Sequence, residues 1–99
     1  MSRTLPSLTA LTFGTLTLSP AFDADVTSYT AETTNATNTI TATAPEGAEI
    51  TISVNGSTLT NGGSARWNTG SNTVAVTVTQ DGASRTYTVT VTKGEVQNG

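Results

Sequence analysis

The chain has 99 residues and a net charge of −3, and it contains neither cysteine nor histidine. That length supports one small domain with a single core, and the missing residue types exclude disulfides, thiolate or imidazole metal ligands, cysteine nucleophiles and histidine bases. Only 11% of the residues are charged and roughly a quarter are threonine, so no basic patch for nucleic acid can form.

Three short strands are predicted in the first half of the chain. Residues 8–18 carry leucines and a phenylalanine in an irregular pattern, which indicates a first strand broken at Gly14. Residues 27–33 place Tyr29 and Ala31 on one face, and residues 39–44 alternate apolar residues with threonine. This alternation with a period of two is typical of strands that have one buried and one solvated face.

Four further strands are predicted in the second half, as two pairs. Each pair is joined by a dipeptide that favours a tight hairpin turn, Asn55-Gly56 in the first and Asp81-Gly82 in the second. The four strands are residues 49–54, 57–60, 72–79 and 86–92. Seven short strands without helical periodicity predict a β-sandwich or barrel, and no apolar run is long enough to span a bilayer, so no membrane insertion is expected.

Several spaced motifs resemble the cadherin-like β-sandwich domain of bacterial surface proteins over about residues 8–93. The motifs are Leu8-x-x-Leu11, Gly14-x-Leu16, Leu18-Ser19-Pro20-x-Phe22, Tyr29, Ile50-x-Ile52-x-Val54-Asn55-Gly56, Gly70-x-Asn72-x-Val74-x-Val76-x-Val78, Asp81-Gly82 and Tyr87-x-Val89-x-Val91-x-Lys93, where Lys93 replaces the more usual arginine. The resemblance implies a seven-stranded antiparallel sandwich of Ig-like or cadherin-like Greek-key topology. It also implies tandem arrays in chains that contain other surface modules, cell-wall-binding repeats or glycoside hydrolases. Because of these neighbouring domains, carbohydrate binding has been suggested for the family.

The domain organisation is expected to be a short arm, one sandwich and a short tail. Residues 1–7 form the arm, residues 8–93 the domain, and the polar, glycine-flanked residues 94–99 a linker stub. The first residues do not form a secretory signal, so we expect a module from a longer exported chain, or a virion protein. The expected location is extracellular, at the cell surface or cell wall, with a phage virion as the alternative.

Asp23 and Asp25 are the one close pair of carboxylates in the sequence. Calcium needs six to eight oxygen ligands, whereas aspartates are common in solvated turns, so the pair is interpreted as a turn and no metal site is predicted. The remaining acids show no spacing that would set two carboxylates across a cleft, and no base is available to activate a serine. No catalytic residue, no cofactor and no enzymatic activity are expected.

Trp67 has two possible interpretations, because it stands in the polar sequence Arg66-Trp67-Asn68. A lone tryptophan in a small sandwich usually fills the core, since it buries a large apolar area. Alternatively, Trp67 is a platform that stacks on a sugar ring while Arg66 and Asn68 bind its hydroxyl groups. The threonine rows also have two possible interpretations. Threonine favours strands and stabilises sheets through cross-strand pairs, which explains the rows without a ligand. Alternatively, the rows form an ordered hydroxyl surface that binds ice or polysaccharide.

The function predicted from the sequence is that of a non-catalytic structural, spacer or adhesion module. Its core is expected to include Leu11, Phe22, Ile52, Val76 and Val89. The partners are neighbouring domains, with cell-wall or host polysaccharide or a surface protein as further candidates, and adhesion would use an exposed sheet edge. A carbohydrate-binding module that uses Trp67 and the loops beside it is the alternative.

Overall fold

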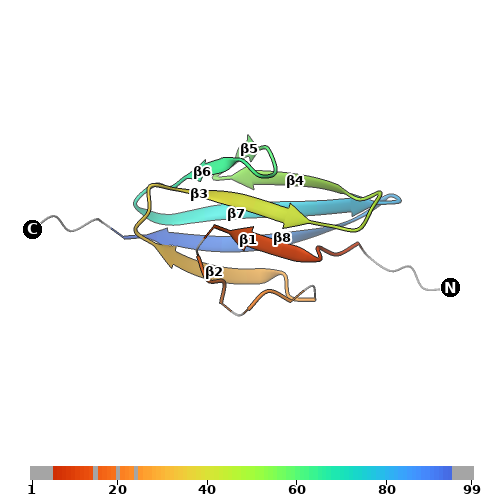
Figure 1. Ribbon diagram of the computed structural model, residues 1–99, viewed down its shortest axis with the longest axis horizontal. Coiled ribbons are helices and arrows are strands. Elements are labelled where there is room, and N and C mark those ends of the chain that lie inside the picture. The colour runs from red at the N-terminus through yellow and green to blue at the C-terminus, as the bar shows by residue number, and fades with distance from the viewer. Residues whose placement is uncertain (1–5, 15, 20, 24, 95–99) are drawn as a thin grey trace, which may run out of the picture.

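Two β-sheets pack face to face in the computed structural model, which describes residues 6–14, 16–19, 21–23 and 25–94 (Figure 1). The smaller sheet has the order β1-β3-β6, and the larger has the order β2-β8-β7-β4-β5. The strands are β1 (Ala10–Phe13), β2 (Ser28–Thr33), β3 (Thr37–Thr43), β4 (Glu49–Val54), β5 (Ser57–Leu59), β6 (Ser64–Arg66), β7 (Gly70–Gln80) and β8 (Ala83–Lys93). The β-sandwich expected from the sequence is confirmed.

The long β7–β8 hairpin is the backbone of the larger sheet. Its register pairs Val74 with Val89 and Val76 with Tyr87, and all four side chains are completely buried. The alternate residues of both strands, which are mostly threonines, lie on the outer face of the sheet. Because a one-residue slip would turn every valine toward water, the alternation sets this register firmly.

Both predicted hairpin turns have the backbone shape that their sequences favour. In the β4–β5 turn Asn55 and Gly56 have φ angles of 50° and 87°, and in the β7–β8 turn Asp81 and Gly82 have φ angles of 54° and 81°. Positive φ at both central residues is the mark of a type I′ turn, whose twist matches that of the flanking strands. These dipeptides therefore fix where β4 ends and where β8 begins.

Strand β6 is an eighth strand, one more than the sequence analysis predicts. It is three residues long and turns one apolar side chain, Ala65, into the core, so it is too short to show an alternating pattern. β6 pairs with the first half of β3, and the side chain of Asn61 continues that edge. The Asn61 carboxamide accepts a hydrogen bond from the Ala42 N–H at 2.9 Å and donates one to the Ala42 carbonyl at 2.8 Å.

The core lies between the two sheets and holds most of the residues predicted for it. Leu11, Ile52, Val76 and Val89 are buried, as expected. Phe22 is half-buried and packs on the outside of this cluster, where its ring stacks on Tyr29 with a centroid distance of 5.9 Å. The expectation that Phe22 lies inside the core therefore needs correction: it covers one side of the core from a connecting segment.

The chain enters and leaves the sandwich at opposite poles of its long axis (Figure 1). β1 begins at the pole where β3 ends, because Ala10 pairs with Thr43, and β8 ends at the other pole, where Lys93 pairs with Gly70. The arm and stub predicted for residues 1–7 and 94–99 fall mostly outside the described residues. Within the described part, no helix of the length and apolarity needed to cross a membrane is present.

Candidate functional site

Trp67 lies in the core, directly after β6, with 4% of its surface exposed. Its ring stacks on Phe13 of β1, with an interplanar angle of 11° and centroids 6.4 Å apart. The indole N–H donates a hydrogen bond of 2.8 Å to the side-chain oxygen of Asn38, so its one polar group is satisfied inside the fold. Of the two interpretations of Trp67, the structure therefore agrees with the core position. A ring that is almost completely buried has no open face on which a sugar could stack.

Arg66 and Asn68, the two neighbours of Trp67, are exposed and border a shallow hollow between the edges of β5 and β6. The hollow has a volume of about 280 Å³, and the hydroxyl-bearing residues Ser57, Thr58 and Ser64 also line it. It lies where the two sheets part at an edge of the sandwich. A glycan contact by Arg66 and Asn68 stays a prediction. It would consist of hydrogen bonds to sugar hydroxyl groups, without stacking on Trp67.

Asn72 is the one residue with an amide, aliphatic hydroxyl or charged side chain that is fully buried in the described part of the chain, and its place in the Gly70-x-Asn72-x-Val74 motif did not predict a role for it. Its side-chain oxygen accepts hydrogen bonds from the Asn55 amide group and the Asn68 backbone N–H, both at 2.9 Å. Its amide group donates to the carbonyls of Asn68, Gly70 and Val91 at 2.9–3.1 Å. Asn72 therefore joins the β4–β5 turn, the β6–β7 connection and β8 at one pole of the sandwich.

A signal for Asn72 is present in the sequence. The residue stands two positions before Val74 and so has the same parity as Val74, Val76 and Val78, which line the buried face of β7. An asparagine in an inward-facing series must find hydrogen-bond partners, because an unsatisfied buried amide is costly. The alternation that predicts the strand therefore also marks Asn72 as a structural polar residue.

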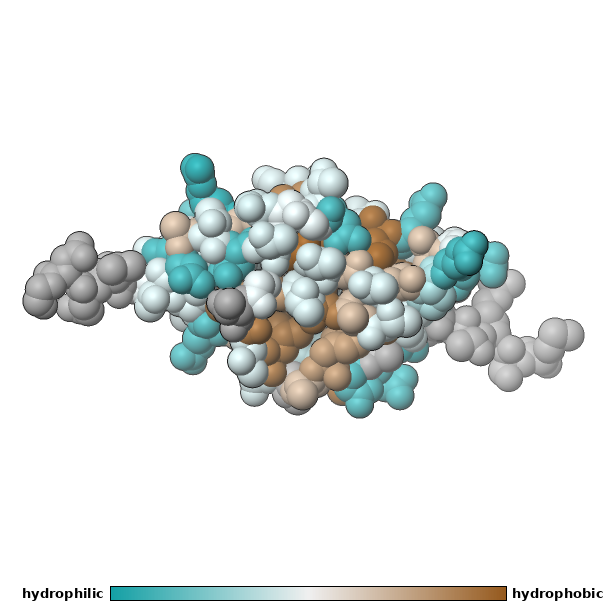
Figure 2. All heavy atoms as spheres, in the orientation of Figure 1, coloured by the Kyte–Doolittle hydropathy of each residue, from teal (hydrophilic) through white to brown (hydrophobic). Residues whose placement is uncertain are grey.

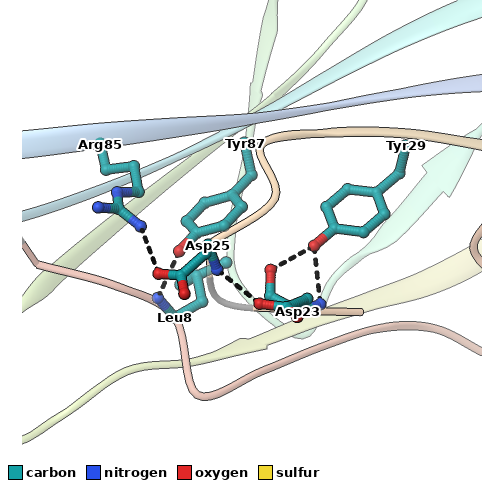
Figure 3. A network of polar contacts seen from close by, with 6 residues as sticks. All are labelled: Leu8, Asp23, Asp25, Tyr29, Arg85 and Tyr87. Carbon is teal, nitrogen blue, oxygen red and sulfur yellow. Dashed lines mark hydrogen bonds and ion pairs between the residues drawn. The ribbon is translucent and has the colours of Figure 1, made fainter. Parts of the chain in front are cut away.

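The two tyrosine hydroxyl groups attach connecting segments to the larger sheet (Figure 3). Tyr29 of β2 donates a hydrogen bond of 2.6 Å to the Asp23 carbonyl and accepts one of 2.9 Å from the Asp23 N–H. Tyr87 of β8 accepts a hydrogen bond of 3.1 Å from the Leu8 N–H. Both rings are buried, so each residue combines core packing with a polar contact to the chain that precedes a strand.

Asp23 and Asp25 form a turn. The Asp25 N–H donates a hydrogen bond of 2.9 Å to the Asp23 side chain, the usual pattern of an aspartate that starts a turn. Asp25 also lies 3.8 Å from Arg85, but the Asp25 side chain is 94% exposed, so this ion pair adds little stability (Figure 3). No three acidic side chains in the described part of the chain converge into a group that could hold a metal ion.

The outer face of the larger sheet carries hydroxyl groups in cross-strand rows. Thr73 pairs with Thr90, and Thr77 pairs with Thr86, whose hydroxyl oxygens are 3.1 Å apart. Ala75 interrupts the rows on β7. Neighbouring strands in a sheet are rotated by roughly 20–25°, so five strands present a twisted surface and not a flat lattice. Cross-strand threonine contacts stabilise the sheet, which explains these rows without a ligand.

The surface seen from the side of the smaller sheet is mostly of intermediate hydropathy, with strongly hydrophilic residues scattered toward its margins (Figure 2). Hydrophobic atoms show through beside β1 and the segment that follows it (Figure 2). A hollow of about 290 Å³ lies there and is lined by Leu11, Leu16, Leu18 and Phe22 among others. Neither this hollow nor the one beside Arg66 contains the paired, buried acid–base groups that hydrolytic chemistry requires.

Comparison with protein-family models matches residues 8–94 to the cadherin-like beta sandwich domain. A comparison with curated proteins finds no significant match. The matched range covers the whole sandwich, from the segment that Tyr87 holds at Leu8 to Gly94, whose N–H bonds to Thr33 after the end of β8. The all-β architecture, the two facing sheets and the family match agree, and the chain therefore belongs to the cadherin-like beta sandwich domain family.

Proposed function

We propose that this domain is a non-catalytic structural module of an extracellular protein, which holds neighbouring domains apart at a bacterial surface or, alternatively, on a phage virion. The observation that carries the proposal is the position of the chain ends: β1 starts at one pole and β8 ends at the other (Figure 1). Domains joined before and after such a unit lie at opposite ends of its long axis. The hydroxyl-rich, weakly charged surface is also suited to an environment of variable salt, because charge screening affects it little.

The edges of the two sheets favour this spacer role over adhesion by strand addition. An exposed edge strand can pair with a partner chain when it is long and regular. β5 and β6 are each three residues long and β1 is four, so these edges offer few backbone groups in a row. The outer edge of β2 is longer, but Ser19 pairs with Thr30 in its middle through two hydrogen bonds of 2.9 Å.

A tandem repeat of the chain tests the spacer proposal. Two copies joined end to end are expected to extend the molecule along one axis, since each adds the length of β7 and β8, about 36 Å for eleven residues. Small-angle X-ray scattering of the single and the doubled chain measures the increase in maximum dimension. A doubled chain whose maximum dimension grows by less than one domain length would mean that the copies fold back on each other, and the proposal would be wrong.

Carbohydrate binding is the second candidate, and the hollow beside Arg66 is the observation that favours it. Arg66 and Asn68 offer hydrogen-bond donors, and no acidic residue lines the hollow. Ligand pockets usually measure about 300–1,000 Å³, so a hollow of about 280 Å³ suits a single sugar unit, with the rest of a chain lying outside it.

Titration with soluble cell-wall and plant polysaccharides tests the second candidate. Binding at the hollow is expected to weaken about tenfold in Arg66→Ala, the loss of one charge-assisted hydrogen bond. Lys93→Ala removes a cation on β8 outside the hollow and is the matched control, with unchanged affinity expected. Calorimetry measures both, and the absence of saturable binding across the panel would rule out the candidate.

A further inference from the structure

β2 and β8 run in the same direction and pair side by side in the larger sheet. Their register covers six pairs, from Ser28 with Thr88 to Thr33 with Lys93. A backbone hydrogen bond closes each end of the ladder: Thr88 N–H donates to the Thr27 carbonyl at 2.8 Å, and Gly94 N–H donates to the Thr33 carbonyl at 2.9 Å. β8, which lies between β2 and β7, is therefore bonded over six of its eleven residues to β2, the edge strand of the larger sheet.

The parallel direction of this pair determines how a pull on the chain ends reaches it. β8 is pulled from its last residue, outward at the pole where Lys93 lies (Figure 1). β2 is pulled from its first residue, toward the opposite pole, because the chain before Ser28 leads back to β1. Two neighbouring strands are thus drawn along their axes in opposite directions. Hydrogen bonds that run across the strands then resist the displacement together, and not one after another.

β1, the strand nearest the N-terminal pole, is held by a shorter ladder, which is antiparallel. β1 pairs with β3 over four residues, from Ala10 with Thr43 to Phe13 with Ile40. Two bonds extend the attachment: Thr9 N–H donates to the Thr43 carbonyl at 2.7 Å, and Leu8 N–H donates to the Tyr87 hydroxyl at 3.1 Å. A pull on the N-terminal side meets this contact before it reaches β2.

We propose that the domain is a load-bearing link, in which the β2–β8 pair is the main barrier to unfolding under axial tension and β1 is a weaker latch that yields first. The proposal extends the spacer function, since a spacer need not resist force. It predicts anisotropy: tension along the long axis is resisted strongly, whereas tension that separates the strands from one pole is not. Forced unfolding is governed by the barrier and not by the equilibrium stability, so the two properties can be measured apart.

Stretching of single molecules in two directions tests the proposal. The chain has no cysteine, so handles attach selectively to cysteines added at the two ends. The comparison molecule carries one handle at the C-terminal end and the other at exposed Thr69→Cys, next to the start of β7 at the same pole, so that β8 is peeled from β7 bond by bond. We expect a rupture force at least about twofold higher for the end-to-end direction at the same loading rate. Equal forces in the two directions would overturn the proposal.

A disulfide between β2 and β8 locates the barrier. Thr30 and Thr90 are register partners on the outer face, so Thr30→Cys with Thr90→Cys can close a crosslink without reaching the core. When the crosslink is closed, end-to-end tension can extend the segment before β2 by roughly 80 Å, for about 22 residues at about 3.5 Å each. We expect this small, low-force extension to remain and the high-force event to vanish. Reduction of the disulfide is expected to restore the high-force event.

A high-force event that persists with the crosslink closed would place the barrier outside the β2–β8 pair and contradict the proposal. These measurements are independent of the scattering test of the spacer function. A domain that extends a tandem chain but unfolds at equal force in both directions is a spacer that bears no load.

Discussion

Replacement of Asn72 by alanine is expected to lower the free energy of unfolding by about 3–4 kcal/mol. The substitution removes the oxygen that binds the Asn55 amide and the Asn68 N–H, and it leaves the carbonyls of Gly70 and Val91 facing a void. Each buried polar group without a partner costs about 1–3 kcal/mol, and solvent can reach some of them at the pole of the sandwich. Because small domains are stable by about 5–15 kcal/mol, a loss of this size brings the fold close to its limit.

Urea unfolding monitored by the fluorescence of Trp67 measures this change. Asn68→Ala is the matched control, because it removes the same type of side chain from an exposed position four residues earlier. Asn68 contacts Asn72 through its backbone N–H and carbonyl, which the substitution retains. We expect Asn68→Ala to shift the unfolding free energy by less than about 0.5 kcal/mol, as is usual for an exposed site. Equal effects of the two substitutions would show that the connections among the three segments do not depend on the Asn72 side chain.

Local patterns in the sequence were sufficient to predict most of the strands. Residues of one parity along β7 and β8 face the core, and a two-residue type I′ turn fixes where a hairpin reverses, so both features are encoded by adjacent residues. Val76, Tyr87 and Val89 are buried as this pattern requires. The size and apolar area of Trp67 favoured its core position, although the polar neighbours Arg66 and Asn68 left a sugar platform open as the alternative.

The pairing between distant segments could not be predicted in the same way. Alternation states which face of a strand is buried but not which strand lies beside it, and the parallel β2–β8 pair joins segments about 60 residues apart. β6 was missed because three residues hold less than two periods of the pattern. The partners of Asn72 come from two loops and a strand, so the network exists only once the chain has folded. The hollow beside Arg66 likewise depends on where the edges of β5 and β6 end.

Replacement of Trp67 by alanine is expected to destabilise the fold by about 3–5 kcal/mol, the usual cost of removing a large buried aromatic side chain. The substitution takes away the surface on which Phe13 stacks and leaves the Asn38 side-chain oxygen without its indole donor. Circular dichroism during urea unfolding measures the change, since the variant lacks a tryptophan. Trp67→Phe retains a ring against Phe13 but not the N–H, so its cost is expected to be about 1–2 kcal/mol, mainly that of the lost hydrogen bond.

Trp67→Ala also distinguishes between the two roles considered for Trp67, core residue and sugar platform. A residue that serves as a sugar platform can be replaced without loss of stability, whereas binding disappears. A residue that fills the core behaves in the opposite way, and its fluorescence lies at shorter wavelength in the folded protein than in urea and does not move when glycans are added. A Trp67→Ala variant that unfolds at the urea concentration of the parent chain would contradict the core role. Phe13 packs against the apolar ring of the indole, and Asn38 accepts the hydrogen bond of its N–H. We therefore expect replacement of Trp67 to change the stability of the fold and not its affinity for a ligand.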